Sequence, residues 1–375
     1  MVFGFGKPHF LGIDFGTSSI KAVELSIEDN RPVLINYGRV ILEDVKRRKE
    51  LEAGGSHDDE IVLYLRELLK SMKPKSDSAY VSMPAFTGLI SLVEFPLMEE
   101  SELQDAARFE AHKYIPSSLD EIALSWEVVN VHDTPGDGQK MEVLLVAALN
   151  KEVARYEKLV TDGGLALNFL ELETFSLARS LVGDERGLFL IIDIGSRATN
   201  LILIDDGAVR VSRNMDDGGT DITRVLAESL GITRERAKLL KKSGKDFLSS
   251  PESALSFPSL QAIAGEAGRM LASYQVRHPG VQCKSVLLSG GVAQFTGLTA
   301  YYSNILKVPV TIGDPWKNVQ HDPMLTPTIG ELGTSFSVAV GLALCGTDMT
   351  LKKKQALTKK TKKDFSLKEF LTKPL

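Results

Sequence analysis

The chain of 375 residues lacks most of the features by which an enzyme or a secreted protein is recognised from its sequence. Its two cysteines, Cys283 and Cys345, form no C-x-x-C pair, which excludes a disulfide framework and makes a reducing cytoplasm the simplest compartment. Its six histidines are scattered without partners at i+3 or i+4, so a histidine-rich metal site is not expected. The chain has no G-x-S-x-G elbow and no G-x-x-x-x-G-K-[ST] loop, which excludes the usual hydrolase and P-loop classes.

Long apolar runs are also missing. The longest ones, Val143–Leu149 and Val338–Cys345, are far shorter than the roughly 20 apolar residues of a membrane-spanning helix. Asp14 interrupts the apolar character of the N-terminal region early. We therefore expect neither a spanning helix nor a signal peptide.

Positive charge is scarce in the body of the chain and is concentrated at its end. The composition, with 43 % apolar and 25 % charged residues, is that of an ordinary globular protein, and the formal net charge is −5. Residues 351–375 hold nine lysines against two carboxylates, a net charge of +7, which leaves −12 for the first 350 residues. We expect a basic tail that is disordered in its Lys/Thr-rich part. A solvated tail and a tail attracted to anionic lipid or to an acidic partner both remain open.

One pattern occurs twice in the chain. Phe10–Leu25 and Leu190–Leu203 each consist of an apolar strand, the sequence Asp-x-Gly-[Ser/Thr] and a second β-rich run. Strand, tight turn and returning strand are typical of a hairpin. The two aspartates, Asp14 and Asp193, lie 179 residues apart, and the repeat predicts two related lobes, each with its own sheet.

The two turns combine the groups that bind phosphate and Mg²⁺. A glycine permits close approach of the backbone, hydroxyl and N–H groups donate to phosphate oxygens, and a carboxylate holds hydrated Mg²⁺. A plain hairpin with an Asx-turn is the alternative for a single copy, whereas two copies favour a metal–phosphate site between the lobes. The candidate residues in the two turns are Asp14, Gly16, Thr17, Ser18, Asp193 and Gly195.

Two glycine pairs follow later in the chain. Gly218 and Gly219 precede a predicted helix, so their N–H groups are candidates to bind a phosphate or ribose oxygen at the positive end of the helix dipole. A linker turn with Thr220 as the N-cap is the alternative. Gly290 and Gly291 follow an apolar strand and would leave a flat backbone surface for an adenine ring. Because such corners are common, it is the order of all four motifs that favours nucleotide binding.

Hydrophobic periodicity and turn residues predict the elements between these motifs. Residues 79–150 are expected to form a compact inserted module of strand, helix, strand and strand, with Ser101 as the N-cap of its helix. The predicted strands are Ala79–Met83, Ile122–Val131, Met141–Leu149 and Ser285–Leu288, and the predicted helices are Glu60–Met72, Ser101–Tyr114, Lys151–Thr161, Leu260–Val276, Leu298–Leu306 and Phe336–Leu344.

In the content and order of its motifs the chain resembles the actin-like ATPases, and within them the PilM-type proteins of type IV pilus assembly, which are related to FtsA. The discriminating stretch lies in the insert, where Val93-Glu-Phe-Pro96 precedes Arg108-Phe-Glu110-Ala and Tyr114-Ile-Pro116. The resemblance covers Phe3 to Cys345. It implies an α/β fold of two actin-like lobes, a duplicated ribonuclease H-like ATPase fold, with a small α+β domain inserted in the first lobe.

The resemblance also implies domain boundaries. The first lobe would comprise residues 4–78, 151–184 and 334–346, and the inserted domain residues 79–150. The second lobe would comprise residues 185–333, with a subdomain of its own at about 216–284. Residues 347–375 would form the basic tail outside the fold.

Residue roles follow from the resemblance as expectations. Asp14 and Asp193 would orient hydrated Mg²⁺, and Lys241 would lie beside the sugar or base of ATP. Glu173 occupies the place of a water-positioning glutamate and, with Asp193, is a candidate catalytic residue; a helix-start carboxylate favoured by the dipole is the alternative. The turn residues Gly16, Thr17, Ser18 and Gly195 would approach the phosphates, and Gly218, Gly219, Gly290 and Gly291 would surround the ribose and adenine.

Two further positions bear on the nucleotide site. Relatives often have a glutamate that accepts hydrogen bonds from the ribose hydroxyls, but this chain has Lys238 there, which cannot accept. The ribose contact, and with it tight ATP binding, is therefore in doubt. Glu266 and Arg269 match a Glu-x-x-Arg pair of the relatives, and an intrahelical i, i+3 ion pair is the alternative.

The implied function is that of a nucleotide-binding scaffold, cytoplasmic and peripheral at the inner membrane, with ATP and Mg²⁺ between the lobes and slow or absent ATP hydrolysis. Its implied partner is the N-terminal cytoplasmic peptide of a PilN-like inner-membrane protein, bound in a groove between the first lobe and the insert. Phe86, Leu89 and Phe109 are candidates to line that groove, and core packing is the alternative for each. A pilus motor ATPase and a second copy of the chain are further candidate partners, and nucleic acid is not expected.

Two alternatives stay open. A small-molecule kinase of the same superfold would need a general base near the γ-phosphate and a substrate pocket, and no motif for either is evident in the sequence. An FtsA-like, membrane-associated filament protein would need a terminal amphipathic helix.

Overall fold

The computed structural model describes residues 7–42, 56–113, 121–134, 138–249 and 254–353. The sheet of the first lobe has the strand order β3-β2-β1-β4-β8. β1 (His9–Phe15), β2 (Ser19–Glu28) and β3 (Arg31–Ile41) are connected as antiparallel neighbours, whereas β4 (Ser78–Met83) and β8 (Ala166–Leu172) continue the sheet in parallel on the other side of β1. The first predicted hairpin is thereby confirmed, since β1 and β2 pair along their length.

The sheet of the second lobe repeats this plan. Its order is β11-β10-β9-β12-β13, and its strands are β9 (Leu188–Ile194), β10 (Thr199–Asp205), β11 (Ala208–Met215), β12 (Cys283–Ser289) and β13 (Val310–Ile312). β9, β10 and β11 are antiparallel, and β12 and β13 are parallel to β9. Because strand order and direction match those of the first sheet, the prediction of two related lobes is confirmed.

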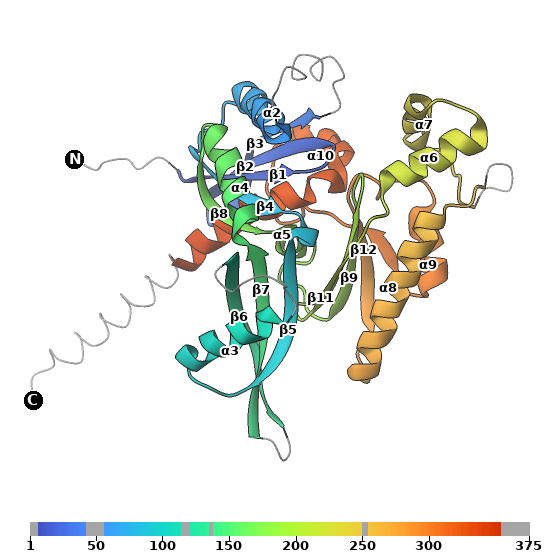
Figure 1. Cartoon of the computed structure of the whole chain (residues 1–375). Coiled ribbons are helices and arrows are strands. Elements are labelled where there is room, and N and C mark those ends of the chain that lie inside the picture. The colour runs from blue at the N-terminus through green and yellow to red at the C-terminus, as the bar shows by residue number, and fades with distance from the viewer. Residues whose placement is uncertain (1–6, 43–55, 114–120, 135–137, 250–253, 354–375) are drawn as a thin grey trace, which may run out of the picture.

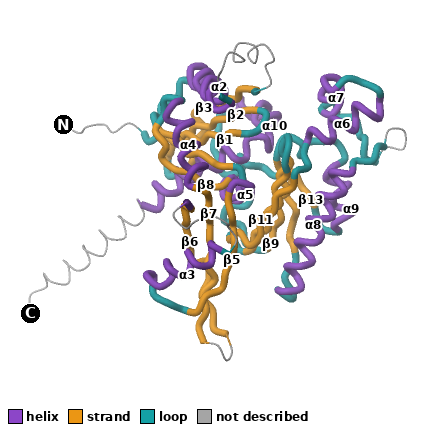
Figure 2. Tube along the Cα trace, viewed as in Figure 1, coloured by secondary structure: helices purple, strands orange, loops and turns teal. Residues whose placement is uncertain are grey.

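A third sheet of three antiparallel strands has the order β5-β7-β6. It consists of β5 (Gly88–Pro96), β6 (Ile122–Thr134) and β7 (Gly138–Leu149), and α3 (Glu100–His112) packs on it through Leu103 and Ala107. This module extends below the first lobe in Figure 1, and Figure 2 shows its long strands in orange.

Two expectations for the module were wrong. The strand predicted at Ala79–Met83 is β4, which belongs to the first lobe because its partners are β1 and β8. The helix begins at Glu100 and not after Ser101, since Glu99 is its N-cap and forms a capping box with Glu102. The predicted end of this helix, at Tyr114 to Pro116, lies outside the described residues.

The remaining helices belong to the two larger lobes. α2 begins three residues before the predicted start, because Ser56 caps it by accepting from the Asp59 N–H at 3.2 Å. The helices of the first lobe are α2 (His57–Met72), α4 (Asn150–Asp162), α5 (Glu173–Leu181) and α10 (Thr326–Leu332). Ile329 of α10 belongs to a core cluster with Val23 and Leu25 of β2, so the expected end of the second lobe at residue 333 was wrong. Those of the second lobe are α6 (Gly219–Leu230), α7 (Arg234–Lys241), α8 (Pro258–Arg277) and α9 (Leu298–Leu306). Figure 1 shows α6 and α7 at the outer end of the second lobe, apart from its sheet.

The C-terminal helix is longer than the predicted Phe336–Leu344. It spans residues 337–353, and Thr347 is fully buried with its hydroxyl donating to the Leu344 carbonyl at 2.8 Å. Leu351 still packs against a core cluster, so the expected end of the fold at residue 346 was wrong. The basic segment from residue 354 onward lies outside the described residues.

By length and composition alone, the helical run Pro323–Lys353 is long and apolar enough to cross a membrane. Its most apolar window is mostly buried inside the protein. Val340 and Ala343 belong to a core cluster with Val23 and Leu25 of β2. The burial therefore assigns this helical run to the core of the fold.

One core cluster joins the two lobes. It contains Phe10 and Tyr80 of the first lobe, Phe189 of the second, and residues of α5 and of the C-terminal helix. The two helices cross in backbone contact at Gly341, where an added Cβ would lie 2.0 Å from the Ser176 carbonyl oxygen. A side chain at this position would force the helices apart, so α5 and the C-terminal helix behave as one packed unit between the lobes.

Candidate functional site

A cavity of about 420 Å³ lies between the lobes, and we call it the interlobe cavity. Of the twelve residues predicted for a nucleotide–metal site, all except Gly218 line it. Those eleven are Asp14, Gly16, Thr17, Ser18, Glu173, Asp193, Gly195, Gly219, Lys241, Gly290 and Gly291. The fold thus brings together residues that are up to 277 positions apart in the sequence.

The two hairpin turns enter this cavity with the same backbone geometry. The Gly16 N–H donates to the Ser19 carbonyl at 3.1 Å, and the Gly195 N–H donates to the Ala198 carbonyl at 2.9 Å. These two N–H groups therefore close the turns and are not available to a ligand. Within the described part of the chain the hydroxyls of Thr17 and Ser18 have no hydrogen-bond partner, so they can donate to a ligand.

The strand register explains the polar partners of the two turn aspartates. Asp14 lies opposite Lys21 in the β1–β2 pair, and Lys21 Nζ donates to Asp14 Oδ2 at 2.8 Å. Asp193 lies opposite Asn200 in the β9–β10 pair. Lys21 and Asn200 were not predicted as site residues, although a lone polar residue seven positions after each turn aspartate was a signal that could have identified both.

Glu173 is the first residue of α5 and is fixed at the floor of the cavity. Its Oε1 accepts from the Ala85 N–H at 2.9 Å and from the Asn200 amide at 2.8 Å. Burial raises the pKa of Glu173 to about 7, and the charges of Asp193 and Asp14 add to this rise while the two hydrogen bonds oppose it. A carboxyl with such a pKa can exchange a proton near neutral pH.

The two turn aspartates suit a hydrated divalent cation. Burial raises the pKa of Asp193 to about 6, and the negative charge of Asp14 contributes to the rise although Ser289 and Lys21 oppose it. Two mutually repelling carboxylates in one cavity fit Mg²⁺, which binds proteins through one or two carboxylates and takes its other ligands from water and phosphate. No group of three or more His, Cys, Asp or Glu side chains suited to a metal occurs in the described ranges.

The interpretation of Gly218 and Gly219 as ligand donors was wrong. The Gly218 N–H donates to the Asp221 carboxylate at 3.0 Å, and the Gly219 N–H donates to the Gly195 carbonyl at 2.9 Å. An added Cβ at Gly218 would lie 2.8 Å from the Ser196 carbonyl oxygen. These glycines let α6 pack directly against the second hairpin turn; Gly218 is the N-cap of α6, so the alternative with Thr220 as the N-cap was also wrong.

Gly290 and Gly291 differ in what they contribute. Gly290 has φ +84° and an added Cβ would lie 2.3 Å from the Ile194 carbonyl oxygen, so the backbone requires glycine there. An added Cβ at Gly291 would meet nothing within 4 Å. Gly291 therefore presents open backbone to the cavity, as expected for a surface that a planar ring can cover.

Basic side chains line the cavity on both sides. Lys21 and Arg39 come from the first lobe, and Lys238, Lys241 and Lys242 come from the end of α7. Lys241 Nζ donates to the Gly219 carbonyl at 2.9 Å and to Thr223 Oγ1 at 3.1 Å, which connects α7 to the start of α6. Arg39 and Lys242 were not predicted from the sequence.

Other predicted positions lie elsewhere. Arg269 donates to Glu266 at 2.9 Å, and neither residue lines the cavity, which supports the intrahelical pair. Phe86 and Phe109 are 61 % and 69 % exposed, so core packing was the wrong interpretation for both. Phe86 lines the interlobe cavity, whereas Phe109 lies on α3 with Lys113 Nζ 5.5 Å from its ring centre.

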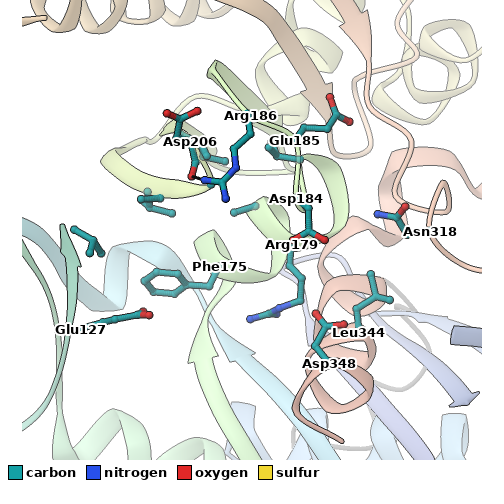
Figure 3. A pocket seen from close by; sticks show the side chains of 18 of the residues that line it. Glu127, Phe175, Arg179, Asp184, Glu185, Arg186, Asp206, Asn318, Leu344 and Asp348 are labelled. Atoms are coloured by element: carbon teal, nitrogen blue, oxygen red, sulfur yellow. Dashed lines mark hydrogen bonds between the residues drawn. The ribbon is translucent and has the colours of Figure 1, made fainter. Parts of the chain in front are cut away.

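A second cavity of about 990 Å³, which we call the insert groove, opens between the first lobe, the inserted module and the second lobe. Its walls come from β6 (Glu127 to Val129), from α5 and the turn after it, from the β10–β11 turn and from the C-terminal helix. Figure 3 shows Phe175 and Glu127 on one side and Arg179, Asp184 and Asp348 on another.

Arg179 of the groove forms a bidentate ion pair with Glu171. It donates to both oxygens of Glu171 at 2.7 and 2.9 Å and to the Gly341 carbonyl at 2.9 Å. The pair therefore connects β8, α5 and the C-terminal helix at the base of the groove.

Two lobes with duplicated sheets, related Asp-x-Gly turns and a cavity between them define the fold of the actin-like ATPases. The family model described as Type IV pilus assembly protein PilM matches residues 12–347, and the chain belongs to this family. The resemblance expected from the sequence is thereby confirmed.

Individual relatives agree with this assignment. A solved "PilM-PilN type IV pilus biogenesis complex" superposes with a TM-score of 0.75 at 23 % identity, covering 91 % of this chain and 99 % of the other. The cell division protein FtsA of Neisseria meningitidis serogroup B is 23 % identical over 231 residues, 53 % of either chain. The chain thus spans about half the length of this curated relative.

Proposed function

We propose that this protein is a scaffold of the type IV pilus assembly platform that binds a nucleotide with Mg²⁺ in the interlobe cavity. The observation that carries the proposal is the convergence of both Asp-x-Gly turns, Glu173 and the Gly290–Gly291 corner on one cavity. Asp14 and Asp193 would hold the hydrated cation, and the hydroxyls of Thr17 and Ser18 would donate to phosphate oxygens. A bound cation would bring its own charge into the cavity, where it offsets the repulsion between the two carboxylates.

The residues around the proposed cation position favour nucleotide binding over rapid nucleotide hydrolysis. Glu173 Oε1 is already held by the Ala85 N–H and the Asn200 amide, so the carboxyl group is fixed in place and a water could meet only its other oxygen. Lys21 is paired with Asp14 at 2.8 Å, and a cation at Asp14 would displace this pairing and leave Lys21 to contact phosphate. We therefore propose nucleotide binding with slow or absent hydrolysis.

Calorimetric titration with ATP and Mg²⁺ tests whether the interlobe cavity binds a nucleotide. Asp14→Asn keeps the size of the side chain and removes its charge, and we expect it to weaken binding at least tenfold, about 1.4 kcal/mol. Asp105→Asn on the exposed side of α3 is the matched control and should bind as the wild type does. Equal affinity of Asp14→Asn and the wild type would contradict the proposed metal–phosphate site.

The partner part of the proposal places the N-terminal cytoplasmic peptide of a PilN-like inner-membrane protein in the insert groove. The groove takes walls from both parts, α5 and the C-terminal helix of the first lobe and β6 of the insert, but the predicted lining residues Phe86, Leu89 and Phe109 are not among those that line it. Apolar side chains such as Phe175, Val182 and Leu344 line the groove together with charged ones, a mixture that a peptide with both kinds of side chain can contact. Such a partner would also hold the protein at the inner face of the inner membrane.

Two valines of β6 provide a matched pair for the peptide experiment. Val128 lines the groove and is 44 % exposed, whereas Val131 on the same strand is 48 % exposed and lies outside the groove lining. We expect Val128→Asp to weaken binding of the PilN-like peptide about tenfold and Val131→Asp to leave it unchanged. If both variants lost affinity for the peptide equally, or if neither lost affinity, the peptide would have to bind elsewhere than in this groove.

A further inference from the structure

The C-terminal helix carries the chain to the insert groove. Asp348, Leu351 and Lys352 of this helix line the groove, and the described part of the chain ends at residue 353. Residues 354–375, which we call the tail segment, therefore start beside the groove. Their sequence holds seven lysines against two carboxylates, and the proposed function gives them no role.

The lining of the insert groove has an excess of negative charge. It contains five carboxylates and four basic side chains. Two of the basic side chains are used in ion pairs, Arg179 with Glu171 and Lys317 with Glu185. Arg186 and Lys352 are the other two. Against these two stand four carboxylates that have no ion pair within the described ranges, namely Glu127, Asp184, Asp206 and Asp348.

The surroundings of Asp348 show that this negative charge is not fully compensated. Burial raises the pKa of Asp348; the positive charges of Arg179 and Lys352 oppose the rise, and the negative charge of Asp184 adds to it. Figure 3 shows Asp184 and Asp348 beside Arg179 in the groove. A further cation near the two aspartates would stabilise the ionised form of Asp348.

Apolar side chains that are only partly covered line the same groove. Phe175 of α5 and Leu351 of the C-terminal helix pack at the border of the core cluster that joins the lobes. An occupant of the groove therefore needs apolar groups as well as positive charge. The tail segment has both, since lysines precede and interrupt a short stretch that holds four of its apolar residues, Phe365, Leu367, Phe370 and Leu371.

The tail segment is also long enough to return to the groove. Ten residues, 354–363, separate the end of the described helix from this apolar stretch, and ten extended residues span up to about 35 Å. Because the segment is attached beside the groove, its effective concentration there is on the order of 1 mM. An attached segment therefore occupies the groove even if its affinity as a free peptide is weak.

We propose that residues 364–371 dock in the insert groove of the same molecule, with their phenylalanines on the apolar lining and the lysines of the tail segment near the unpaired carboxylates. The docked segment competes with the PilN-like peptide, a consequence that rests on the proposed function, whereas the docking itself does not. If the free segment had a Kd of about 0.1 mM, an effective concentration of about 1 mM would fill the groove about ten times as often as it is empty and would weaken the binding of a competing peptide about tenfold.

A fluorophore sensitive to its environment, attached at Ser366→Cys in the full chain, tests the docking without any partner. Cys283 and Cys345 are buried, which shields them from the labelling reagent. We expect the blue-shifted emission of a shielded dye. Replacing both Phe365 and Phe370 by serine should remove most of this shift.

Charge reversal in the groove should have the same effect on the emission. Glu127→Lys combined with Asp184→Lys replaces two exposed carboxylates of the lining, so the variant is expected to fold. Asp105→Lys combined with Asp133→Lys is the matched control, because both residues are exposed on the insert and lie outside the groove lining. The control should keep the blue-shifted emission.

Titration of the PilN-like peptide tests the competition. Replacing Phe365 and Phe370 by serine should tighten the binding of this peptide about tenfold, because the groove is then free. Replacing Thr358 and Thr361 by serine alters the tail segment outside the apolar stretch and should leave the affinity for the peptide unchanged.

The outcomes separate the docking from the proposed function. Emission that is the same in the wild type, the phenylalanine variant and the groove variant would overturn the docking. A shift that depends on protein concentration, or that occurs only with phosphatidylglycerol vesicles, would mean that the tail segment binds a second copy or a lipid surface, and the docking would again be overturned. If the emission behaves as expected but no PilN-like peptide binds, the docking stands and the proposed partner fails. If the peptide binds equally well to the wild type and the phenylalanine variant, the competition is refuted.

Discussion

Replacing Glu173 by glutamine should stabilise the protein without ligand, and more so at alkaline than at acidic pH. Burial raises the pKa of Glu173 from its usual value near 4.5 to about 7. A raised pKa means that the folded protein favours the neutral carboxyl, so stability is lost as the pH rises above 4.5 and the loss levels off above 7. Glutamine is neutral at all pH values, and its side-chain oxygen can still accept from the Ala85 N–H and the Asn200 amide.

The size of the expected stabilisation follows from the rise in the pKa of Glu173. Each pKa unit corresponds to about 1.4 kcal/mol, so ionisation of Glu173 costs about 3 kcal/mol at pH 8 and about 1 kcal/mol at pH 5. Urea unfolding of Glu173→Gln and the wild type between pH 5 and pH 8 measures this difference.

Glu157→Gln on the exposed side of α4 is the control, and its unfolding free energy should follow the wild-type pH profile. A stability difference that does not grow with pH, or a variant less stable than the wild type at pH 8, would refute the reasoning. The first result would mean that the carboxyl is solvated in the folded protein, and the second that its charge is required by Asn200 or the Ala85 N–H.

Two further predictions concern the packed unit of α5 and the C-terminal helix. Gly341→Ala should destabilise the protein by about 2 kcal/mol or more in urea unfolding, because the added Cβ would lie 2.0 Å from the Ser176 carbonyl oxygen. Gly330→Ala is the control; its added Cβ would meet nothing within 4 Å, so it should be neutral or slightly stabilising. Arg179→Met should lower the free energy of unfolding by about 3–5 kcal/mol, because it leaves the buried Glu171 carboxylate without its cation. Arg179→Met combined with Glu171→Leu should recover most of that stability. No recovery in the double variant would contradict the ion-pair account.

The sequence was informative where structure is local. An apolar strand followed by Asp-x-Gly and a second β-rich run determines a hairpin within about 16 residues, and both hairpins were predicted with their aspartates at the cavity. Residues that face each other across such a hairpin are also predictable in principle, as Asp14 and Lys21 show. Gly290 was singled out with Gly291 as a flat backbone surface after a strand, and its φ of +84°, which favours glycine for a different reason, is known only from the structure.

The wrong predictions concern residues whose hydrogen-bonding partners are distant in the sequence. The strand at Ala79–Met83 was assigned to its sequence neighbours, but its partners β1 and β8 lie more than 60 residues away on either side. The N–H group of Gly219 was expected to face a ligand, but its partner is the carbonyl of Gly195, which becomes adjacent only when α6 packs on the second turn. Side-chain patterns indicate which groups are polar, and they do not show which of them the fold has already paired.

The two cavities share structural elements, and this leads to the last prediction. α5 contributes Glu173 to the interlobe cavity and Phe175 and Arg179 to the insert groove, and the C-terminal helix contributes Val338 to the first and Leu344 to the second. We expect a ligand that changes how these elements pack in one cavity to change the other, because the two helices are in backbone contact.

If both proposed ligands bind, their affinities should be coupled. Titrating the PilN-like peptide with and without nucleotide, and the nucleotide with and without peptide, should give the same factor in both directions, since coupling free energies are reciprocal. We expect a factor of about 5 or more, the lower end of what such couplings typically reach. Equal peptide affinity with and without nucleotide would show that α5 and the C-terminal helix hold the two cavities together without transmitting between them, and the protein would then act as a passive scaffold.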